Sequence, residues 1–136
     1  MATDPQFAST ISLGSALLGA TAETDTLAPA QTSIIVTAGT NGTKIEQITV
    51  QAAKTGTLIA TTVNGLVYLF LYDGSTYRLF DTITVVATVA STTVAPFHAE
   101  KLYTNLVLKS GWSLRASQSI AGNVSILQVT AFGGDF

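Results

Sequence analysis

The stretch that decides the fold is Gly65-Leu-Val-Tyr-Leu-Phe-Leu-Tyr-Asp-Gly-Ser-Thr-Tyr-Arg-Leu-Phe-Asp81. Its first part, Leu66 to Tyr72, is a run of seven large apolar or aromatic residues. A strand with one face in water alternates apolar and polar residues, so an unbroken run predicts a strand that is covered on both faces. The Asp73-Gly74 turn signal, followed by further β-prone residues, predicts that this strand opens a β-hairpin.

The pairing within this hairpin separates two kinds of surface. A two-residue loop at Gly74-Ser75 predicts the cross-strand pairs Tyr72 with Tyr77, Leu71 with Arg78, Phe70 with Leu79, Leu69 with Phe80 and Tyr68 with Asp81. The aliphatic face, which we expect in the core, carries Val67, Leu69, Leu71 and Phe80. The other face, which we expect to meet a partner, carries Tyr68, Phe70, Tyr72 and Tyr77. The alternative is that both faces lie inside one sandwich, with the N-terminal arm over the tyrosine side.

The rest of the chain predicts an all-β protein, because Thr, Val and Ile dominate and no long stretch keeps a 3.6-residue apolar period. Turn signals divide it into short β-prone runs. Besides the hairpin, the predicted strands are 33–38, 43–52, 97–103, 106–109, 112–116 and 124–132, with weaker candidates at 56–63 and 87–96. Eight or nine strands without a helix indicate a jelly-roll-like, two-sheet antiparallel sandwich. We expect residues 1–31 to be an extended N-terminal arm, with at most one short strand near 7–13, and residues 32–136 to be the sandwich domain.

The composition limits the classes of partner. A chain of 136 residues predicts one domain, and charged residues make up 10% of it, against about 25% in an average soluble domain. Much of the polar surface must come from 22 Thr and 11 Ser. A net charge of −2 with six scattered basic residues argues against direct nucleic-acid binding. No apolar run is long enough for a membrane span, and the lack of cysteine excludes disulfides and thiolate metal sites.

Residues that could carry chemistry are few. His98 and Glu100 supply two metal ligands at most, and Asp73 and Asp81 are better explained by turn and hairpin structure than as catalytic carboxylates. The sequence therefore predicts no catalytic residue, metal or cofactor. Trp112 could stack on a sugar or base but is more typical of a core or interface cap, and Arg115 is a candidate ion-pair partner across a subunit boundary. The predicted contact residues are Tyr68, Phe70, Tyr72, Tyr77, Trp112, Phe7 and Phe136.

Five segments together carry a resemblance to a known group of proteins. They are Pro5-Gln-Phe-Ala-Ser-Thr10, Thr37-Ala-Gly-Thr-Asn-Gly-Thr43, Leu69-Phe-Leu-Tyr-Asp-Gly-Ser-Thr-Tyr-Arg-Leu-Phe80, Leu106-Val-Leu-Lys-Ser-Gly-Trp-Ser-Leu-Arg-Ala-Ser117 and Ala131-Phe-Gly-Gly-Asp-Phe136. In combination the chain resembles small virion proteins encoded by tailed bacteriophages and prophages. The resemblance implies a component like the capsid decoration, or cement, proteins, which brace neighbouring capsomers as trimers.

This resemblance sets the functional expectations. They are a homotrimer that binds the phage major capsid protein on the virion surface, after synthesis in the bacterial cytoplasm. The alternative is a receptor- or carbohydrate-binding module of a tail fibre or baseplate that uses Trp112 and the loop tyrosines. A ring-forming tail or head-completion component is a third possibility, and an enzyme is the last.

Overall fold

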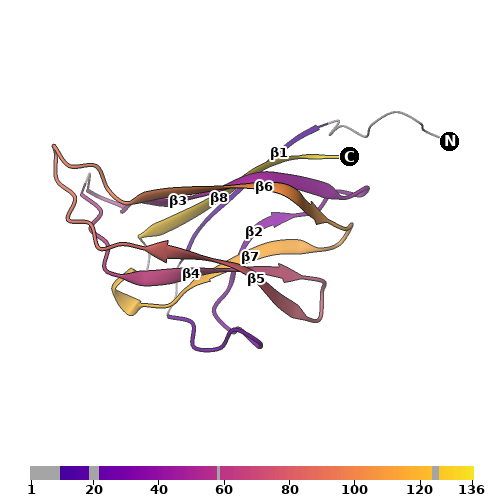
Figure 1. Ribbon diagram of the computed structural model, residues 1–136, viewed down its shortest axis with the longest axis horizontal. Helices are drawn as coiled ribbons and strands as arrows, with labels where there is room; N and C mark the ends of the chain where they lie inside the picture. Colours follow the sequence, from indigo (N-terminus) through magenta and orange to yellow (C-terminus); the bar gives the residue numbers. More distant parts are fainter. Residues whose placement is uncertain (1–9, 19–21, 58, 124–125) are drawn as a thin grey trace.

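The chain folds into two antiparallel four-stranded sheets packed face to face, as the computed structural model shows (Figure 1). The structure describes residues 10–18, 22–57, 59–123 and 126–136. Sheet 1 has the order β1-β8-β3-β6, with bounds Thr10–Leu17, Leu127–Asp135, Thr43–Ala52 and His98–Leu108. Sheet 2 has the order β2-β7-β4-β5, with bounds Ser33–Thr37, Ser113–Gln118, Gly65–Tyr72 and Tyr77–Val85. This arrangement of eight strands is that of a jelly roll, so the predicted fold class is confirmed.

The hairpin of β4 and β5 divides its side chains as predicted. Val67 and Leu69 point between the sheets and are fully buried in the core. The pairs next to the turn follow the predicted register, since Tyr72 faces Tyr77 and Phe70 faces Leu79. Beyond them the predicted register is wrong, because a β-bulge leaves Phe80 unpaired and shifts every later partner by one residue.

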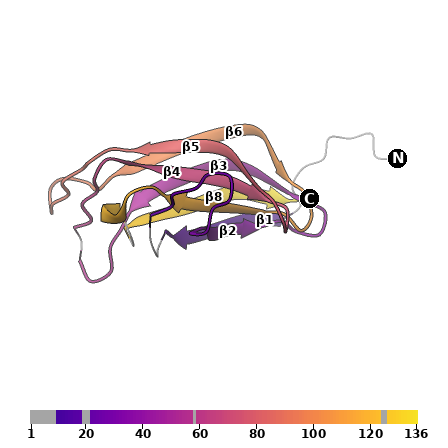
Figure 2. The same cartoon turned by 90° about the horizontal axis from the view of Figure 1, so that it is seen from below.

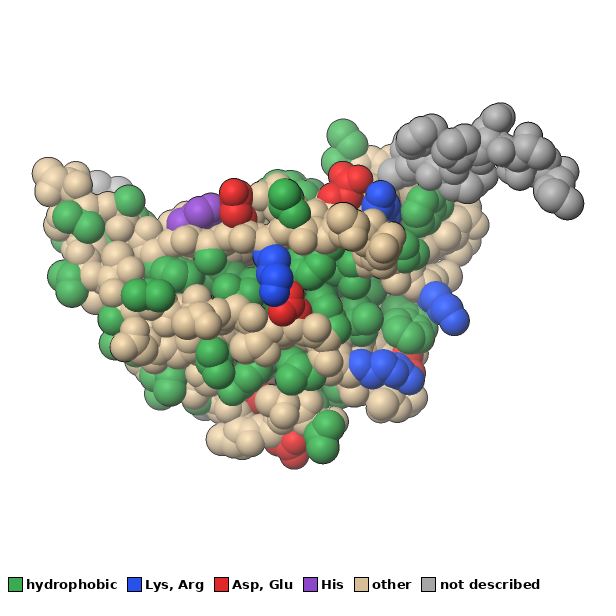
Figure 3. Space-filling view, viewed as in Figure 1, with side chains coloured by type: hydrophobic (Ala, Val, Ile, Leu, Met, Phe, Trp, Pro, Cys, Tyr) green, Lys and Arg blue, Asp and Glu red, His purple; other side chains and the backbone are tan. Residues whose placement is uncertain are grey.

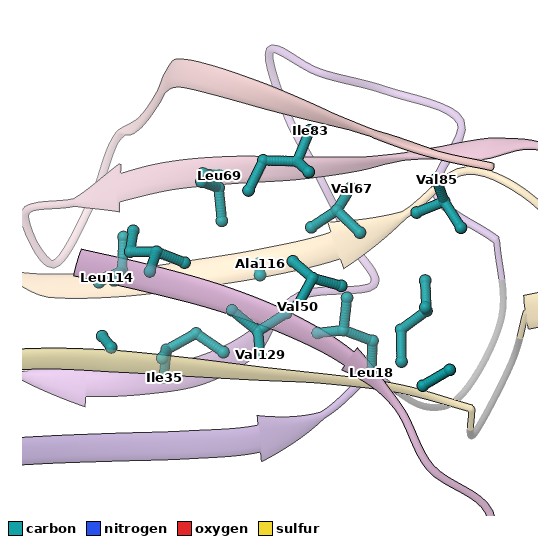
Figure 4. Close-up of a cluster of buried hydrophobic side chains, with 14 of the residues drawn as sticks. Leu18, Ile35, Val50, Val67, Leu69, Ile83, Val85, Leu114, Ala116 and Val129 are labelled. Carbon is teal, nitrogen blue, oxygen red and sulfur yellow. The ribbon is translucent and has the colours of Figure 1, made fainter. Parts of the chain in front are cut away.

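The core between the sheets is aliphatic (Figure 4). Val50 and Val129 of sheet 1 lie opposite Leu69, Leu114 and Ala116 of sheet 2, and all five are at most 1% exposed. Branched and small aliphatic side chains of this kind pack densely between two sheets and carry no polar atom to satisfy.

The two long sides of the sandwich are closed differently. On one side β1 lies against β2, and the approach is so close that a Cβ at Gly14 would lie 2.1 Å from the carbonyl oxygen of Ile35. On the other side β5 and β6 run side by side without backbone pairing (Figure 2). There the Asp81 carboxylate accepts hydrogen bonds from Lys101 at 2.8 Å and from the Tyr103 hydroxyl at 2.7 Å, which joins the sheets.

The sandwich begins earlier in the chain than the predicted boundary at residue 32. Residues 10–17 of the predicted arm form β1, and all eight pair with β8. Residues 22–32 cross to sheet 2 and lie on its outer side, at the bottom of Figure 1. Two hydrogen bonds fix them there: the Glu23 amide donates to the carbonyl of Gln118, and the Thr32 and Tyr77 hydroxyls lie 3.2 Å apart.

Three other strand predictions differ from the structure. The predicted strands 97–103 and 106–109 are one strand, β6, which a bulge against β3 accommodates. Among the described residues of 56–63 and 87–96 the structure has only isolated bridges, Lys54 to Thr57 and Thr62 to Thr88. The part of the chain that the structure describes has no helix long and apolar enough to cross a membrane.

Candidate contact surfaces

The outer face of sheet 1 carries two adjacent rows of exposed apolar side chains. In the first row, cross-strand pairing aligns Leu13, Phe132, Gln47 and Leu102, one from each strand. Leu13 is 63% exposed, Leu102 75% and Phe132 42%. The next row aligns Ile11, Gly134, Lys44 and Val107, and its two apolar side chains, at the ends of the row, are 89% and 50% exposed. We call these five apolar side chains the apolar rows: Ile11, Leu13, Leu102, Val107 and Phe132.

Apart from Leu17, which is 42% exposed at the end of β1, the remainder of this face is mainly polar and nearly neutral. Ser15 and Thr130 are joined through their hydroxyls at 3.0 Å, and Glu100 accepts a hydrogen bond from Gln47 at 2.9 Å. His98 Nδ1 lies 2.8 Å from the amide oxygen of Gln51. Scattered apolar residues are ordinary on a protein surface, but a contiguous apolar patch marks an interaction site.

The outer face of sheet 2 carries the four aromatic residues that the sequence assigned to partner contact. Tyr68, Tyr72 and Tyr77 are partly buried, whereas Phe70 is fully buried. The ring centroids of Tyr72 and Tyr77 are 4.3 Å apart, and those of Phe70 and Tyr77 are 5.9 Å apart. Because residues 22–32 also lie on this side, the arrangement is closer to the alternative in which the arm covers the tyrosine face. Partner contact by the three tyrosines stays a prediction, and Phe70 is out of reach of a partner in this conformation.

Arg115 lies among these tyrosines. Its guanidinium carbon is 4.2 Å from the ring centroid of Tyr72 and 5.8 Å from that of Tyr77. Its Nε donates to Ser113 Oγ at 3.0 Å, and one terminal nitrogen donates to the Tyr77 hydroxyl at 3.1 Å. Cation–π contacts and hydrogen bonds therefore hold this cation in one position.

The other predicted contact residues are scattered. Trp112 is partly buried against the core, with the Arg78 guanidinium 5.2 Å and the Lys109 ammonium 5.9 Å from its ring centroid. Phe136 is partly buried, and its amide donates to the carbonyl of Gly42 at 3.1 Å. Phe7 lies outside the described residues. The seven predicted residues thus do not form one surface.

The candidate chemical groups have structural partners. Asp73 accepts hydrogen bonds from the amides of Ser75 and Thr76 within the turn, as its turn chemistry predicted. Arg78 pairs with it at 2.8 Å, and this bond holds the pKa of Asp73 well below its usual range. Within the described residues no three His, Asp or Glu side chains are grouped as a metal site. A shallow depression of about 280 Å³ is lined by Leu17, Ala53, Lys54, Thr55 and Gln128, and these side chains include no nucleophile paired with a base.

Asp81 and Tyr103 form an electrostatically coupled pair between the two sheets. Burial opposes ionisation of Asp81, but the hydrogen bonds from Lys101 and Tyr103 outweigh it and lower the pKa of that carboxyl. Burial and the neighbouring Asp81 carboxylate raise the pKa of the Tyr103 hydroxyl well above its usual value. Hydrophobic side chains fill the space between the two layers on this side of the molecule, and charged side chains are few (Figure 3). The group is an inter-sheet tie rather than an open site.

The apolar rows are not among the contact residues that the sequence predicts. One sequence pattern could have indicated part of them: Ile11, Leu13 and Leu17 follow a spacing of two, but they lie before the predicted domain boundary. The remaining members become neighbours only through the pairing of β8, β3 and β6. Comparisons of the chain with protein-family models, curated proteins and solved structures found no match.

Proposed function

We propose that this chain is a structural protein of a bacteriophage virion: a capsid decoration protein that binds capsomers as an oligomer and stabilises the head. The observation that carries the proposal is the pair of apolar rows on the outer face of sheet 1. Such a role needs a large, weakly charged contact surface and no reacting group. The phage context and the trimer number rest on the resemblance described above.

The size of the face is adequate for a stable contact. Four strands spaced about 4.8 Å apart and about 30 Å long cover about 600 Å². Contact with a matching surface would bury about 1,200 Å² in total, which exceeds the roughly 1,000 Å² of a specific interface. We assign this face to the shell, and the major capsid protein is the partner that the proposal names.

Reconstitution tests the proposal. Purified chain is added to heads assembled without it, and the bound copies and the temperature of head rupture are measured. The double variant Leu13→Ser with Leu102→Ser removes the two ends of the first row, and Glu100→Gln on the same face is the matched control. Two lost leucine contacts of about 1.5–3 kcal/mol each predict at least a hundredfold weaker binding, since 1.4 kcal/mol is tenfold. A wild-type chain that neither joins heads nor changes their heat resistance would overturn the proposal.

The tail-fibre alternative has weaker support. Its key residue, Trp112, is packed partly against the core and lies near two cations, which leaves less ring surface for a sugar. Glycan binding by the wild-type chain that is lost in Trp112→Ala would favour this alternative over the decoration protein.

A further inference from the structure

Arg115 is a fixed cation without an anionic partner in the described residues. Their three ion pairs use Lys44, Arg78 and Lys101. A guanidinium has five N–H donors, and two of those of Arg115 are used, by Ser113 and Tyr77. Three donors therefore remain unpaired within the described part of the molecule.

The surroundings of Arg115 restrict what can cover it. Cross-strand pairing places Ile34 on one side of it, and Phe70 and then Leu79 on the other. Ile34 is 51% and Leu79 41% exposed, so this partly buried cation has apolar neighbours that are open to solvent. A partner that buried such a surface without an acceptor would strand an unpaired charge, which costs several kcal/mol. A cover that brings a carboxylate together with apolar surface would satisfy both the cation and its neighbours.

A second copy of this chain carries both. Asp25 is exposed, and its carboxylate is positioned by the amides of Leu27 at 2.8 Å and Ala28 at 3.0 Å. It has no cationic partner among the residues that the structure describes. Leu27, two residues further on, is 86% exposed. Both belong to the loop of residues 22–32 at the bottom of Figure 1, and acidic and hydrophobic side chains project there in Figure 3.

We propose that the outer face of sheet 2 is a contact between copies of this chain, in which Asp25 of one copy pairs with Arg115 of the next. In this contact Leu27 of one copy packs beside Ile34 and Leu79 of the other. The proposal deepens the proposed function, on which it rests, by locating the contact that builds the oligomer. The carboxylate and the cation lie on the same side of the molecule, so two facing copies could exchange two such pairs in an isologous contact, or each copy could pair with the next around a ring.

Charge exchange tests the contact. The mass of the full-length chain is measured by analytical ultracentrifugation over a range of concentrations for wild type, Arg115→Glu, Asp25→Arg and the double variant. Each single swap puts like charges together and is expected to raise the dissociation constant at least tenfold, while the double variant restores assembly. Asp25→Asn is a more conservative variant. It removes the charge, while the amide oxygen can still accept the hydrogen bonds of the loop.

Mixing the two single variants distinguishes a two-fold contact from a ring. In a two-fold pair of unlike variants, one contact joins the unchanged Asp25 and Arg115, and the other joins the introduced Arg and Glu, so both are attractive and mixing restores assembly in full. In a ring of three, two kinds of chain cannot alternate, and one repelled contact remains, so restoration is partial. Full or partial restoration supports the contact, and no restoration by either mixing or the double variant overturns it.

Lys109→Gln is the matched control, because it removes an exposed cation beside an aromatic ring outside this face. It is expected to assemble like wild type, and circular dichroism checks that every variant is folded. A wild-type chain that stays monomeric at all concentrations overturns the inference, as does normal assembly of both single swaps. The two proposals fail separately: a monomer that binds heads overturns only this contact, and an oligomer that ignores heads overturns only the decoration role.

Discussion

Substitution of Gly14 by alanine should destabilise the fold, although Gly14 lies in the segment that the sequence assigned to an extended N-terminal arm. Gly14 is on β1, where an added Cβ would lie 2.1 Å from the carbonyl oxygen of Ile35 and 2.8 Å from Cβ of Val36. Both obstacles belong to β2 or are fixed to its backbone. Rotation of a side chain cannot relieve the overlap, so one of the two edge strands must move.

The expected cost follows from this geometry. Overpacking that forces a backbone shift costs about 1–3 kcal/mol, and a backbone obstacle on two sides places Gly14→Ala toward the upper end. For a chain of this length 1 kcal/mol corresponds to about 3–5 °C in Tm. We therefore expect Gly14→Ala to lower Tm by about 6–15 °C.

Thermal unfolding followed by circular dichroism measures this change. The matched control is Ser15→Ala, the next residue of β1, whose exposed hydroxyl meets only Thr130 across the strand pair. That change should stay within about 0.5 kcal/mol, the usual range for a surface substitution. A Tm of Gly14→Ala within about 1–2 °C of the control's Tm would contradict this reasoning. It would mean that β1 is not packed against β2 and that the sandwich domain begins after the arm, as the sequence predicted.

Four further predictions concern buried or partly buried polar groups. Tyr103→Phe removes one hydrogen bond to Asp81 and should lower the unfolding free energy in urea by about 1 kcal/mol; an unchanged midpoint would contradict the inter-sheet tie. The pKa of Asp81 is lowered, so its contribution to stability is present above about pH 4 and is lost as the pH falls through the folded-state pKa. In Asp81→Asn, the unfolding free energy should therefore depend less on pH at the acid end of the curve. The pKa of Tyr103 is raised, so its contribution to stability is fully present below about pH 10 and is lost as the pH rises toward the higher folded-state pKa. Tyr103→Phe should remove this fall of the unfolding free energy at alkaline pH. Ser117→Ala should raise stability by about 1 kcal/mol, because the buried Ser117 hydroxyl has no partner within the described residues; a loss of stability on calorimetry would show that a bound water serves it.

Local sequence signals predicted the hairpin well near its turn and less well away from it. The Asp73-Gly74 signal defines the loop, so the pairs closest to it follow directly. The bulge at Phe80 has no comparable local signal, because its cause lies in the other sheet. With one extra residue, Phe80 can pack against Tyr103, at 6.1 Å between ring centroids, while Asp81 reaches the Tyr103 hydroxyl.

The domain boundary was placed too late for a similar reason. Prolines and small residues make the first 31 residues resemble a linker, and Gly14 lowers strand propensity within Thr10–Leu17. That glycine is required for the close approach to β2, so the residue that weakens the local signal is the one that permits the tertiary contact. Propensity scales register the cost of such a residue but not its partner strand.

The two outer faces of the sandwich differ in a way that bears on how the molecule could join an assembly. Sheet 1 presents few charges and apolar side chains that are 42% to 89% exposed, a surface that contact with a complementary apolar partner would stabilise. Sheet 2 presents a cation held against two tyrosine rings, which favours a partner that brings a carboxylate to one position. Because the faces point in opposite directions, one molecule can use both contacts at once. A protein that braces a shell needs a broad contact for affinity and a selective contact for register, and the described part of this chain offers one surface of each kind.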